Sequence, residues 1–322
     1  MPIVLNQDAL FIANDEVREA SRMEDYVAVI ERAYAAYGRG KTFDFPRHTL
    51  WAPGEKGGRK SLKLLATADP EDKTMGGYVY SGGYRHSRGW QKCFLLYDFE
   101  RGHLKAVIEA EHLSWLKTGA VSAVAARHLA RPDASRVGLF GAGKQAVTQL
   151  EGLCAVRPIA SVKVYARRLE AREEFCRTMA ERLALSVIPV SRPEDALTDS
   201  DIIVTATTAK DPLFNGTLLK EGMHVNAIGA HYQEIRELDE AALAGHKVVV
   251  DTLFCLEEAG EFVLAGLGEK DIHAELGEIV AGIKPGRTSP REITIFKSAG
   301  RGLEYLALAQ HIYQRITSPA HQ

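Results

Sequence analysis

The sequence predicts an α/β protein in which a doubly wound parallel sheet is joined to a second, sheet-rich domain. Two observations favour this class. In the second half of the chain, short apolar segments alternate with helical stretches, which is the pattern of a parallel sheet covered on both faces. The first of these segments runs directly into the glycine-rich stretch "GAGKQA" at 141–146, which has the form of a dinucleotide-binding turn.

The composition is that of a globular protein able to bury a sizeable core, with 322 residues of which 46% are hydrophobic and 25% charged. A net charge of −2 argues against broad binding to nucleic acid or an anionic membrane. The segment "GGYVYSGGYRHSRGW" at 76–90 mixes glycine, tyrosine and arginine as single-strand nucleic-acid binders do. Its strand-like texture favours the other interpretation, in which strand glycines let a ligand or another backbone approach closely.

The remaining global features predict a cytoplasmic protein without a metal site. The N-terminus lacks a basic segment before an apolar core, and no apolar run reaches the ~18–20 residues that span a bilayer. His224, His246 and His273 show no metal-ligand spacing. We expect free thiols in a reducing compartment, because no C-x-x-C pair occurs among the four cysteines, Cys93, Cys154, Cys176 and Cys255.

The first half of the chain combines helices with a sheet-forming region. Ser21 to Glu24 has a capping-box pattern, and apolar residues at helical spacing then predict a helix that ends at Gly38. Short strand-like segments separated by turns fill 43–108, and helical texture returns at 111–130.

The second half contains the predicted parallel strands and a final helix. The strands are expected at 136–140, 161–166, 201–207, 224–229, 247–252 and 292–296. The segment "RGLEYLALAQHIYQRI" at 301–316 looks like a helix that leaves this domain, and its natural partner is the N-terminal region.

The glycine-rich turn predicts pyrophosphate binding. Gly141 would make the tight turn, Gly143 would let the backbone approach the phosphates, and Ala146 would keep the following helix close to the strand. The helix would present free N–H groups to the anion. The candidate contacts are Gly141, Ala142, Gly143, Lys144 and Gln145. The alternative is an ordinary glycine-rich turn between a strand and a helix.

The end of the second strand favours NADPH over NADH. NAD enzymes usually place an acid there to bond the ribose 2′-hydroxyl. Here Ala166 is followed by Arg167 and Arg168, and guanidinium groups suit a 2′-phosphate. The alternative is a solvated loop that does not discriminate between the cofactors.

Several separated motifs occur in order along the chain: "VGLFGAGKQA", "DIIVTATTAKDPLF", "MHVNAIGAH", "ELGEIVAG" and "TIFKSAGRGLEYLALAQ". In these motifs the chain resembles the ornithine cyclodeaminase/mu-crystallin family, from about residue 45 to about residue 310. The resemblance implies an NAD(P)-binding Rossmann domain over 118–302. It also implies a substrate-binding and dimerisation domain over 1–117, completed by the C-terminal helix 303–322. NAD(H) or NADPH, a small amino or imino acid substrate and a homodimer are implied with it.

The resemblance also assigns positions residue by residue. On the cofactor side it implies a phosphate contact at Thr118, the pyrophosphate turn at Gly141, Gly143 and Gln145, the adenosine side at Thr207, and the nicotinamide side at Ile228, Gly229 and Ser298. On the substrate side Arg47 matches a carboxylate-binding arginine.

Three positions depart from the family pattern. The second carboxylate-binding arginine is Lys117 here, which keeps the charge but loses the bidentate fork. The family's substrate lysine falls near Tyr78, and Lys63 in the preceding strand can send its amine toward the same pocket. The catalytic aspartate of cyclodeaminases is replaced by His231.

These positions favour an NADPH-linked reductase of a ketimine or cyclic imine acid, or the reverse amino-acid dehydrogenation. Arg47 and Lys117 can anchor a carboxylate, and His231 can exchange a proton near neutral pH, with Lys63 or Tyr78 as substitutes. The alternatives are an ornithine cyclodeaminase-type cyclisation with recycled NAD, which the lost aspartate disfavours, and a non-catalytic NADPH-binding protein like the crystallins.

Each candidate also has an interpretation without chemistry. His231 can be an ordinary loop histidine, and Tyr78 can belong to simple sheet packing. Lys63 can point to solvent by strand alternation, because an unpaired ammonium among leucines is costly to bury.

Overall fold

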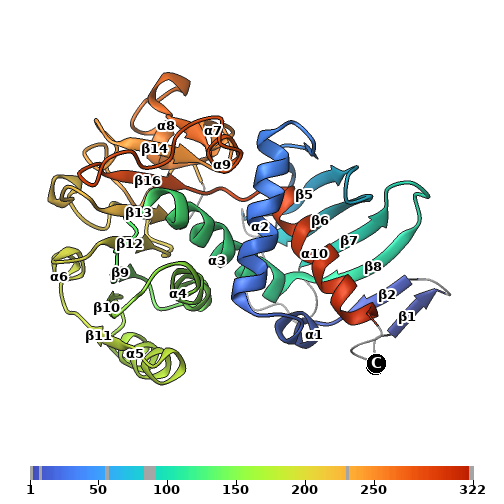
Figure 1. The fold of residues 1–322 in the computed structure, drawn as a ribbon, viewed down its shortest axis with the longest axis horizontal. Helices are drawn as coiled ribbons and strands as arrows, with labels where there is room; N and C mark the ends of the chain where they lie inside the picture. The colour runs from blue at the N-terminus through green and yellow to red at the C-terminus, as the bar shows by residue number, and fades with distance from the viewer. Residues whose placement is uncertain (1–2, 7–8, 55–57, 83–91, 230–231, 319–322) are drawn as a thin grey trace. The chain divides into compact units, whose positions relative to one another are not determined.

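The computed structural model describes residues 3–6, 9–54, 58–82, 92–229 and 232–318. They form two compact units, which are coloured by residue number in Figure 1. Unit 1 comprises 1–117 with 301–322, and unit 2 comprises 118–300. The mixed α/β class expected from the sequence is confirmed, with one predominantly antiparallel sheet in unit 1 and one parallel sheet in unit 2.

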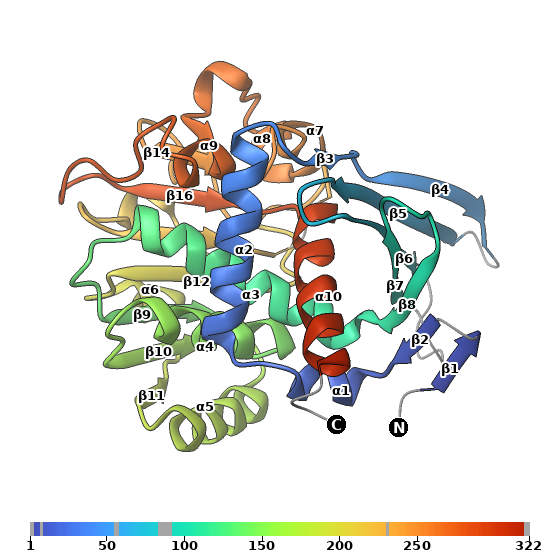
Figure 2. The same cartoon turned by 45° about the vertical axis from the view of Figure 1, so that its right-hand side comes forward.

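The sheet of unit 1 has the order β1-β2-β8-β7-β6-β5-β3, with β4 paired to β5 (Figure 2). Its described pairings are antiparallel except for β2 with β8. The strands are β1 (Ile3–Asn6), β2 (Ala9–Ile12), β3 (Phe43–Asp44), β4 (His48–Pro53), β5 (Arg59–Asp69), β6 (Thr74–Gly82), β7 (Lys92–Asp98) and β8 (Leu104–Glu109). The sheet-forming texture predicted for 43–108 is therefore confirmed.

Two long helices pack in unit 1. Helix α2 (Met23–Gly38) and the final helix α10 (Gly302–Thr317) lie side by side, and α10 also contacts β5, β6 and β7 (Figure 1). The last helix therefore packs within the N-terminal unit. A short helix, α1 (Asn14–Glu19), precedes α2.

The predicted capping box at Ser21 was wrong by one residue. Arg22 is the N-cap of α2, and its N–H donates to the Asp25 carboxylate. The Ser21 hydroxyl instead lies 2.7 Å from His311 Nε2 on α10. The Ser21 side chain therefore makes a tertiary hydrogen bond instead of capping α2 as the local sequence pattern had predicted.

The sheet of unit 2 has the order β11-β10-β9-β12-β13-β16-β14-β15, and all its described pairings are parallel. Its strands are β9 (Arg136–Phe140), β10 (Ser161–Tyr165), β11 (Ser186–Pro189), β12 (Ile202–Thr205), β13 (His224–Ala227), β14 (Lys247–Val250), β15 (Ala274–Glu275) and β16 (Thr294–Lys297). The strand order reverses between β9 and β12, which is the point where doubly wound sheets bind ligands.

Helices and two apolar clusters cover this parallel sheet. The helices are α3 (Ala110–Leu129), of which residues from 118 belong to unit 2, and α4 (Lys144–Val156), α5 (Leu169–Leu183), α6 (Pro193–Leu197), α7 (Cys255–Glu258), α8 (Gly260–Val263) and α9 (Leu276–Val280). Phe175 and Met179 of α5 belong to one cluster, and Phe214 and Phe262 to the other. Strands β12, β13 and β16 are buried throughout, as expected for the centre of a parallel sheet covered on both faces.

Helices α3 and α4 touch at two glycines. A Cβ on Gly119 would lie 2.3 Å from the Thr148 carbonyl oxygen, and one on Gly152 would lie 2.5 Å from the Gly119 carbonyl oxygen. Only glycine allows this approach, which brings Thr118 next to α4, where the Thr118 carbonyl accepts from Gln149 Nε2 at 3.1 Å.

Within the described ranges, no helix combines the length and apolar character needed to cross a membrane.

Candidate cofactor and substrate sites

The glycine-rich turn has the geometry of a phosphate-binding loop. Gly141 follows β9 with φ +114°, and a Cβ there would lie 2.4 Å from the Ala206 carbonyl oxygen, so only glycine fits. Gly143 is the N-cap of α4, and its Cβ position faces open space. Gln145 Oε1 is buried without a partner among the described residues. The open space and the helix N-terminus together fit a pyrophosphate.

Arginines surround the end of β10. Ala166 precedes Arg167 and Arg168, both exposed, and Arg168 is the N-cap of α5. Arg172 on α5 is buried and donates from Nη1 to the Ala166 carbonyl at 3.3 Å. The sequence interpretation missed Arg172, although the run "RRLEAR" shows three arginines within six residues. The ribose end of the cofactor would therefore meet positive charge.

A buried glutamate joins the ends of β12 and β13. Glu237 Oε1 accepts from the Thr207 N–H at 2.7 Å and from its hydroxyl at 2.6 Å, while Oε2 accepts from the Gly229 N–H at 2.9 Å. Ile228, just before Gly229, donates its N–H to the Thr205 carbonyl. The sequence interpretation missed Glu237, because its stretch "QEIRELDE" reads as a solvated acidic surface.

Ser298 at the end of β16 is held by a second buried acid. Its hydroxyl donates to Asp251 Oδ2 at 2.7 Å, and the N–H groups of Ala299 and Gly300 donate to the same oxygen. These bonds fix the loop predicted to contact the nicotinamide. His231 lies outside the described residues, so its candidate role stays a prediction.

In unit 1 the side chain of Lys63 points away from solvent. It is 5% exposed, whereas Leu62 and Leu64 beside it on β5 are 49% and 41% exposed. The suggestion that alternation turns Lys63 to solvent was therefore wrong, since the leucines occupy that face. Its ammonium lies 5.4 Å from the centre of the Tyr80 ring and 5.8 Å from that of Trp51, and such rings stabilise a buried cation.

Three tyrosines form a stacked cluster, which we call the tyrosine cluster. The ring of Tyr78 lies 4.8 Å from that of Tyr80 and 3.9 Å from that of Tyr305, centre to centre. The Tyr305 hydroxyl lies 3.2 Å from the hydroxyl of Ser114. Burial raises the pKa of Tyr78, so its hydroxyl stays protonated at neutral pH.

Lys117 lies at the other end of this cluster. Its ammonium is 4.9 Å from the centre of the Tyr305 ring and 2.5 Å from Glu304 Oε2. Tyr34 donates its hydroxyl to Glu304 Oε1, also at 2.5 Å. The structure thus brings Lys63, Tyr78 and Lys117 to one cluster. Glu304 and Tyr305, which the sequence interpretation did not single out, complete it.

Arg47 lies half-buried in the segment between β3 and β4. It precedes Thr49 by two residues, and Thr49 is the cross-strand partner of Lys63. Arg47 therefore leads into the strand that pairs with the strand of Lys63.

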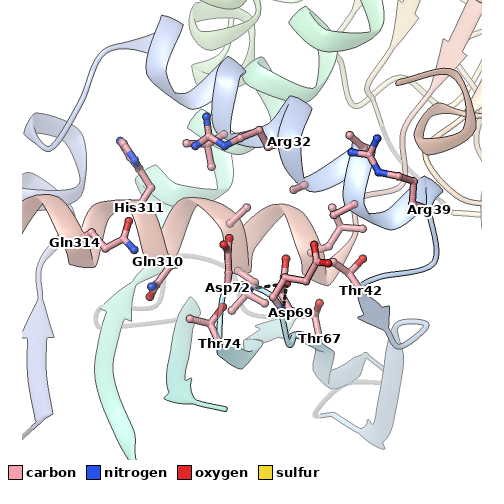
Figure 3. Close-up of a pocket in the computed structure, with 18 residues that line it drawn as sticks. Arg32, Arg39, Thr42, Thr67, Asp69, Asp72, Thr74, Gln310, His311 and Gln314 are labelled. Carbon is pink, nitrogen blue, oxygen red and sulfur yellow. Dashed lines mark hydrogen bonds between the residues drawn. The ribbon is translucent and has the colours of Figure 1, made fainter. Parts of the chain in front are cut away.

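A separate polar cavity of about 300 Å³ lies between α2, α10 and the β5–β6 hairpin. Figure 3 shows its lining, which includes Arg32, Arg39, Asp69, Asp72 and His311. Neither the predicted substrate residues nor the tyrosine cluster line this cavity. Its cations and carboxylates are mixed, and we assign it no part in the chemistry.

No group of histidines, cysteines and acids suited to a metal occurs in the part of the chain that the structure describes.

The parallel sheet, its strand reversal and the turn at Gly141 define the class of Rossmann-type dinucleotide-binding proteins. The family model for the ornithine cyclodeaminase/mu-crystallin family matches residues 7–320. The chain belongs to this family, and the resemblance expected from the motifs is confirmed.

Individual relatives are similar over nearly the whole chain. A Delta(1)-pyrroline-2-carboxylate reductase of Bacillus cereus is 33% identical over 323 residues, covering 95% of this chain and 96% of the relative. The structure of Thermococcus litoralis Delta(1)-pyrroline-2-carboxylate reductase in complex with NADH and L-proline has a TM-score of 0.89 at 31% identity, covering 95% and 97% of the two chains. An archaeal alanine dehydrogenase dimer with bound NAD has a TM-score of 0.88 at 31% identity, covering 96% of each chain.

Proposed function

We propose that this chain is an NADPH-linked reductase of an imino acid, either a ketimine or a cyclic imine, or an enzyme of the reverse amino-acid dehydrogenation. The observation that carries the proposal is the buried ammonium of Lys63 beside the tyrosine cluster. The named activities of the relatives support it, since they are an imine reductase and an amino-acid dehydrogenase with nicotinamide cofactors.

The substrate carboxylate would be held mainly by Arg47 and Lys63. A cation screened from water attracts a carboxylate more strongly than an exposed one. Lys117 stays in the proposal as a cation near the substrate, but Glu304 already balances its charge. Its main effect would be to hold Tyr305, and through that ring Tyr78, in place.

The imine nitrogen must gain a proton as the carbon receives hydride. We propose His231 as the donor, because an imidazole exchanges protons near neutral pH without a large change in its pKa. Tyr78 is better suited to donating a hydrogen bond, since burial raises the pKa of its hydroxyl. Lys63 is the substitute donor if His231 is not required.

The bound cofactor supplies the hydride, and the residues of unit 2 would orient it. The turn from Gly141 through Gln145, with Ala142, Gly143 and Lys144, would hold the pyrophosphate, with Thr118 nearby on α3. Arg167 and Arg168, after Ala166, would pair with a 2′-phosphate. The nicotinamide half would lie against Ile228, Gly229 and Ser298, with Thr207 toward the adenosine.

The proposal is tested by mixing the protein with NADPH and a panel of imines and following the nicotinamide absorbance. The panel contains pyrroline-2-carboxylate, its six-membered homologue, and 2-oxo acids supplied with amines. We expect oxidation of NADPH that depends on one class of imine. Tight NADPH binding without oxidation by any of them would favour the non-catalytic binder. Ammonia release from L-ornithine alone with NAD would favour the cyclodeaminase.

We also propose that the protein is a homodimer formed through unit 1. Strands β3 to β5 carry an exposed apolar face, which we call the β4–β5 face: Phe43, Phe45, Leu50, Leu62 and Leu64. Leu50 and Leu62 are cross-strand partners, so the face is contiguous rather than scattered. Contiguous exposed apolar surface of this kind marks protein interfaces, and light scattering measures the state directly.

A further inference from the structure

We propose that Glu237 is a positioning residue for the cofactor. Its carboxylate fixes the loops after β12 and β13 in the arrangement that presents Thr207 and Gly229 to a dinucleotide. This inference rests on the proposed cofactor binding, because Thr207 and Gly229 are its predicted contacts on the adenosine and nicotinamide sides.

One carboxylate joins two strand ends. Glu237 Oε1 accepts two hydrogen bonds from Thr207, and Oε2 accepts one from the Gly229 N–H. Since β12 and β13 are adjacent parallel strands, these are neighbouring loops at the carboxyl edge of the sheet. Burial raises the pKa of the Glu237 carboxyl, while Lys297 and the hydrogen bonds from Thr207 favour its ionised form. Three hydrogen bonds converge on this one side chain, so the loops are held more firmly than by backbone contacts alone.

The carboxylate is itself held in place. Glu237 is fully buried, its N–H donates to Glu261 Oε1 at 3.0 Å, and its carbonyl accepts from the Leu213 N–H at 2.9 Å. Glu261 in turn pairs through Oε2 with Lys297 at 3.1 Å, and both of these side chains are buried. Lys297 belongs to β16, the strand beside β13, so the network spans three consecutive strand ends.

The approach of Gly229 to Glu237 requires glycine. A Cβ on Gly229 would lie 2.1 Å from the Glu237 carboxyl carbon, so a larger residue there would displace the carboxylate from its present position. The glycine predicted to contact the nicotinamide is therefore also the residue that allows the glutamate to reach its backbone.

The role of Thr207 changes as a result. Its hydroxyl donates to Glu237 and accepts from the Ala209 N–H at 3.0 Å. Because both interactions are internal, Thr207 would meet the cofactor through the shape of its loop and not through its hydroxyl proton. Glu237 sets that shape.

The experiment measures NADPH affinity by nicotinamide fluorescence in Glu237→Gln and in a matched control, Asp201→Asn. The glutamine amide must turn its NH₂ toward one of the present donors, which leaves at least one N–H without an acceptor. Asp201 is also a buried carboxylate that accepts from backbone N–H groups, but it lies at the amino end of β12. Both variants should lose thermal stability.

We expect Glu237→Gln to raise the NADPH Kd at least tenfold and to leave kcat at saturating cofactor within threefold. Asp201→Asn should keep the Kd within twofold of the wild type. If Glu237→Gln does not fold, Glu237→Asp replaces it, since it keeps the charge but is too short to reach both loops, and it should raise the Kd in the same way.

An unchanged Kd in the folded Glu237 variants, or equal losses of affinity in the Asp201→Asn control, would overturn the inference and leave the proposed function intact. A wild-type protein that binds neither NADPH nor NADH would overturn both. The two failures are therefore distinguished by the wild-type titration.

Discussion

The ammonium of Lys117 lies 2.5 Å from the carboxylate of Glu304, and both side chains are buried. Breaking such a pair by changing one partner leaves an uncompensated charge and costs about 3 kcal/mol or more, whereas replacing both avoids that penalty. We expect Glu304→Gln and Lys117→Met each to lower the free energy of unfolding by about this amount. The double variant should recover much of the loss in urea titrations. Strictly additive losses would contradict the pairing.

The arginines after β10 predict which cofactor is preferred. If Arg167 and Arg168 bind a 2′-phosphate, changing both to serine should weaken NADPH binding at least tenfold, since a hydrogen bond to a charged group contributes about 1.5–3 kcal/mol. NADH binding should stay within twofold. Arg177→Ser on the exposed side of α5 is the matched control, because Arg177 pairs there with Glu174. Equal losses for the two cofactors would refute the assignment.

The proposed proton donor is tested by the pH dependence of the rate. We expect His231→Asn to lower kcat and to remove an ionisation near neutral pH from the profile of kcat/KM. The substitution His103→Asn in unit 1 serves as a control outside the predicted site. A profile unchanged in His231→Asn would assign the proton to Lys63 instead.

The stability of unit 2 should depend on pH through His224. Its Nδ1 lies 2.9 Å from the Thr294 hydroxyl and its Nε2 lies 3.0 Å from Asn226 Oδ1. Burial lowers its pKa from the ordinary 6.5 to about 3. Between these pH values the His224 imidazole is protonated in the unfolded chain and neutral in the folded chain. His224 therefore opposes folding increasingly as the pH falls from 6.5 to 3.

Between pH 6.5 and pH 3, His224 should lower the free energy of unfolding by about 1.4 kcal/mol for each unit by which the pH falls. Urea unfolding of the wild type and of His224→Gln at several pH values isolates the contribution, because all other titrating groups are shared. The variant should be less stable at pH 7 and lose less as the pH falls. If the free energy of unfolding changed with pH in the same way for both proteins, the predicted contribution of His224 would be contradicted.

The β4–β5 face predicts where the dimer can be disrupted. A charge at Leu62 would be desolvated in the interface, so Leu62→Glu should yield monomers in light scattering while the far-ultraviolet circular dichroism is retained. Leu169→Glu is the matched control, since Leu169 is similarly exposed on unit 2. A wild-type monomer, or a Leu62→Glu protein that remains a dimer, would exclude this interface.

Local patterns predicted the parts of the site whose geometry is local. The turn at Gly141 is encoded in six consecutive residues, and the strand before it and helix after it follow the same pattern. The arginines after β10 were found for the same reason. The two orientations open to Lys63 were equally compatible with strand alternation, and only the position of Leu62 and Leu64 on the opposite face decides between them.

Long-range pairing could not be predicted in this way. Lys117 and Glu304 are 187 residues apart in the chain, and nothing near either residue indicates the other. Glu237 sits among acids that look solvated, and its burial depends on Gly229 and Glu261 meeting it from other elements. The sequence therefore shows the cofactor turn better than the charges that support the rest of the site.

The return of α10 to unit 1 has a consequence for biosynthesis. During translation, all of unit 2 leaves the ribosome before the residues of α10 that complete unit 1. Unit 2 can begin to fold as its own residues emerge, whereas the sheet of unit 1 must wait with part of one face uncovered. Until Glu304 arrives, Lys117 lacks its counter-charge and Tyr78 lacks the ring of Tyr305. Chaperones should therefore engage the nascent chain chiefly through the strands made first.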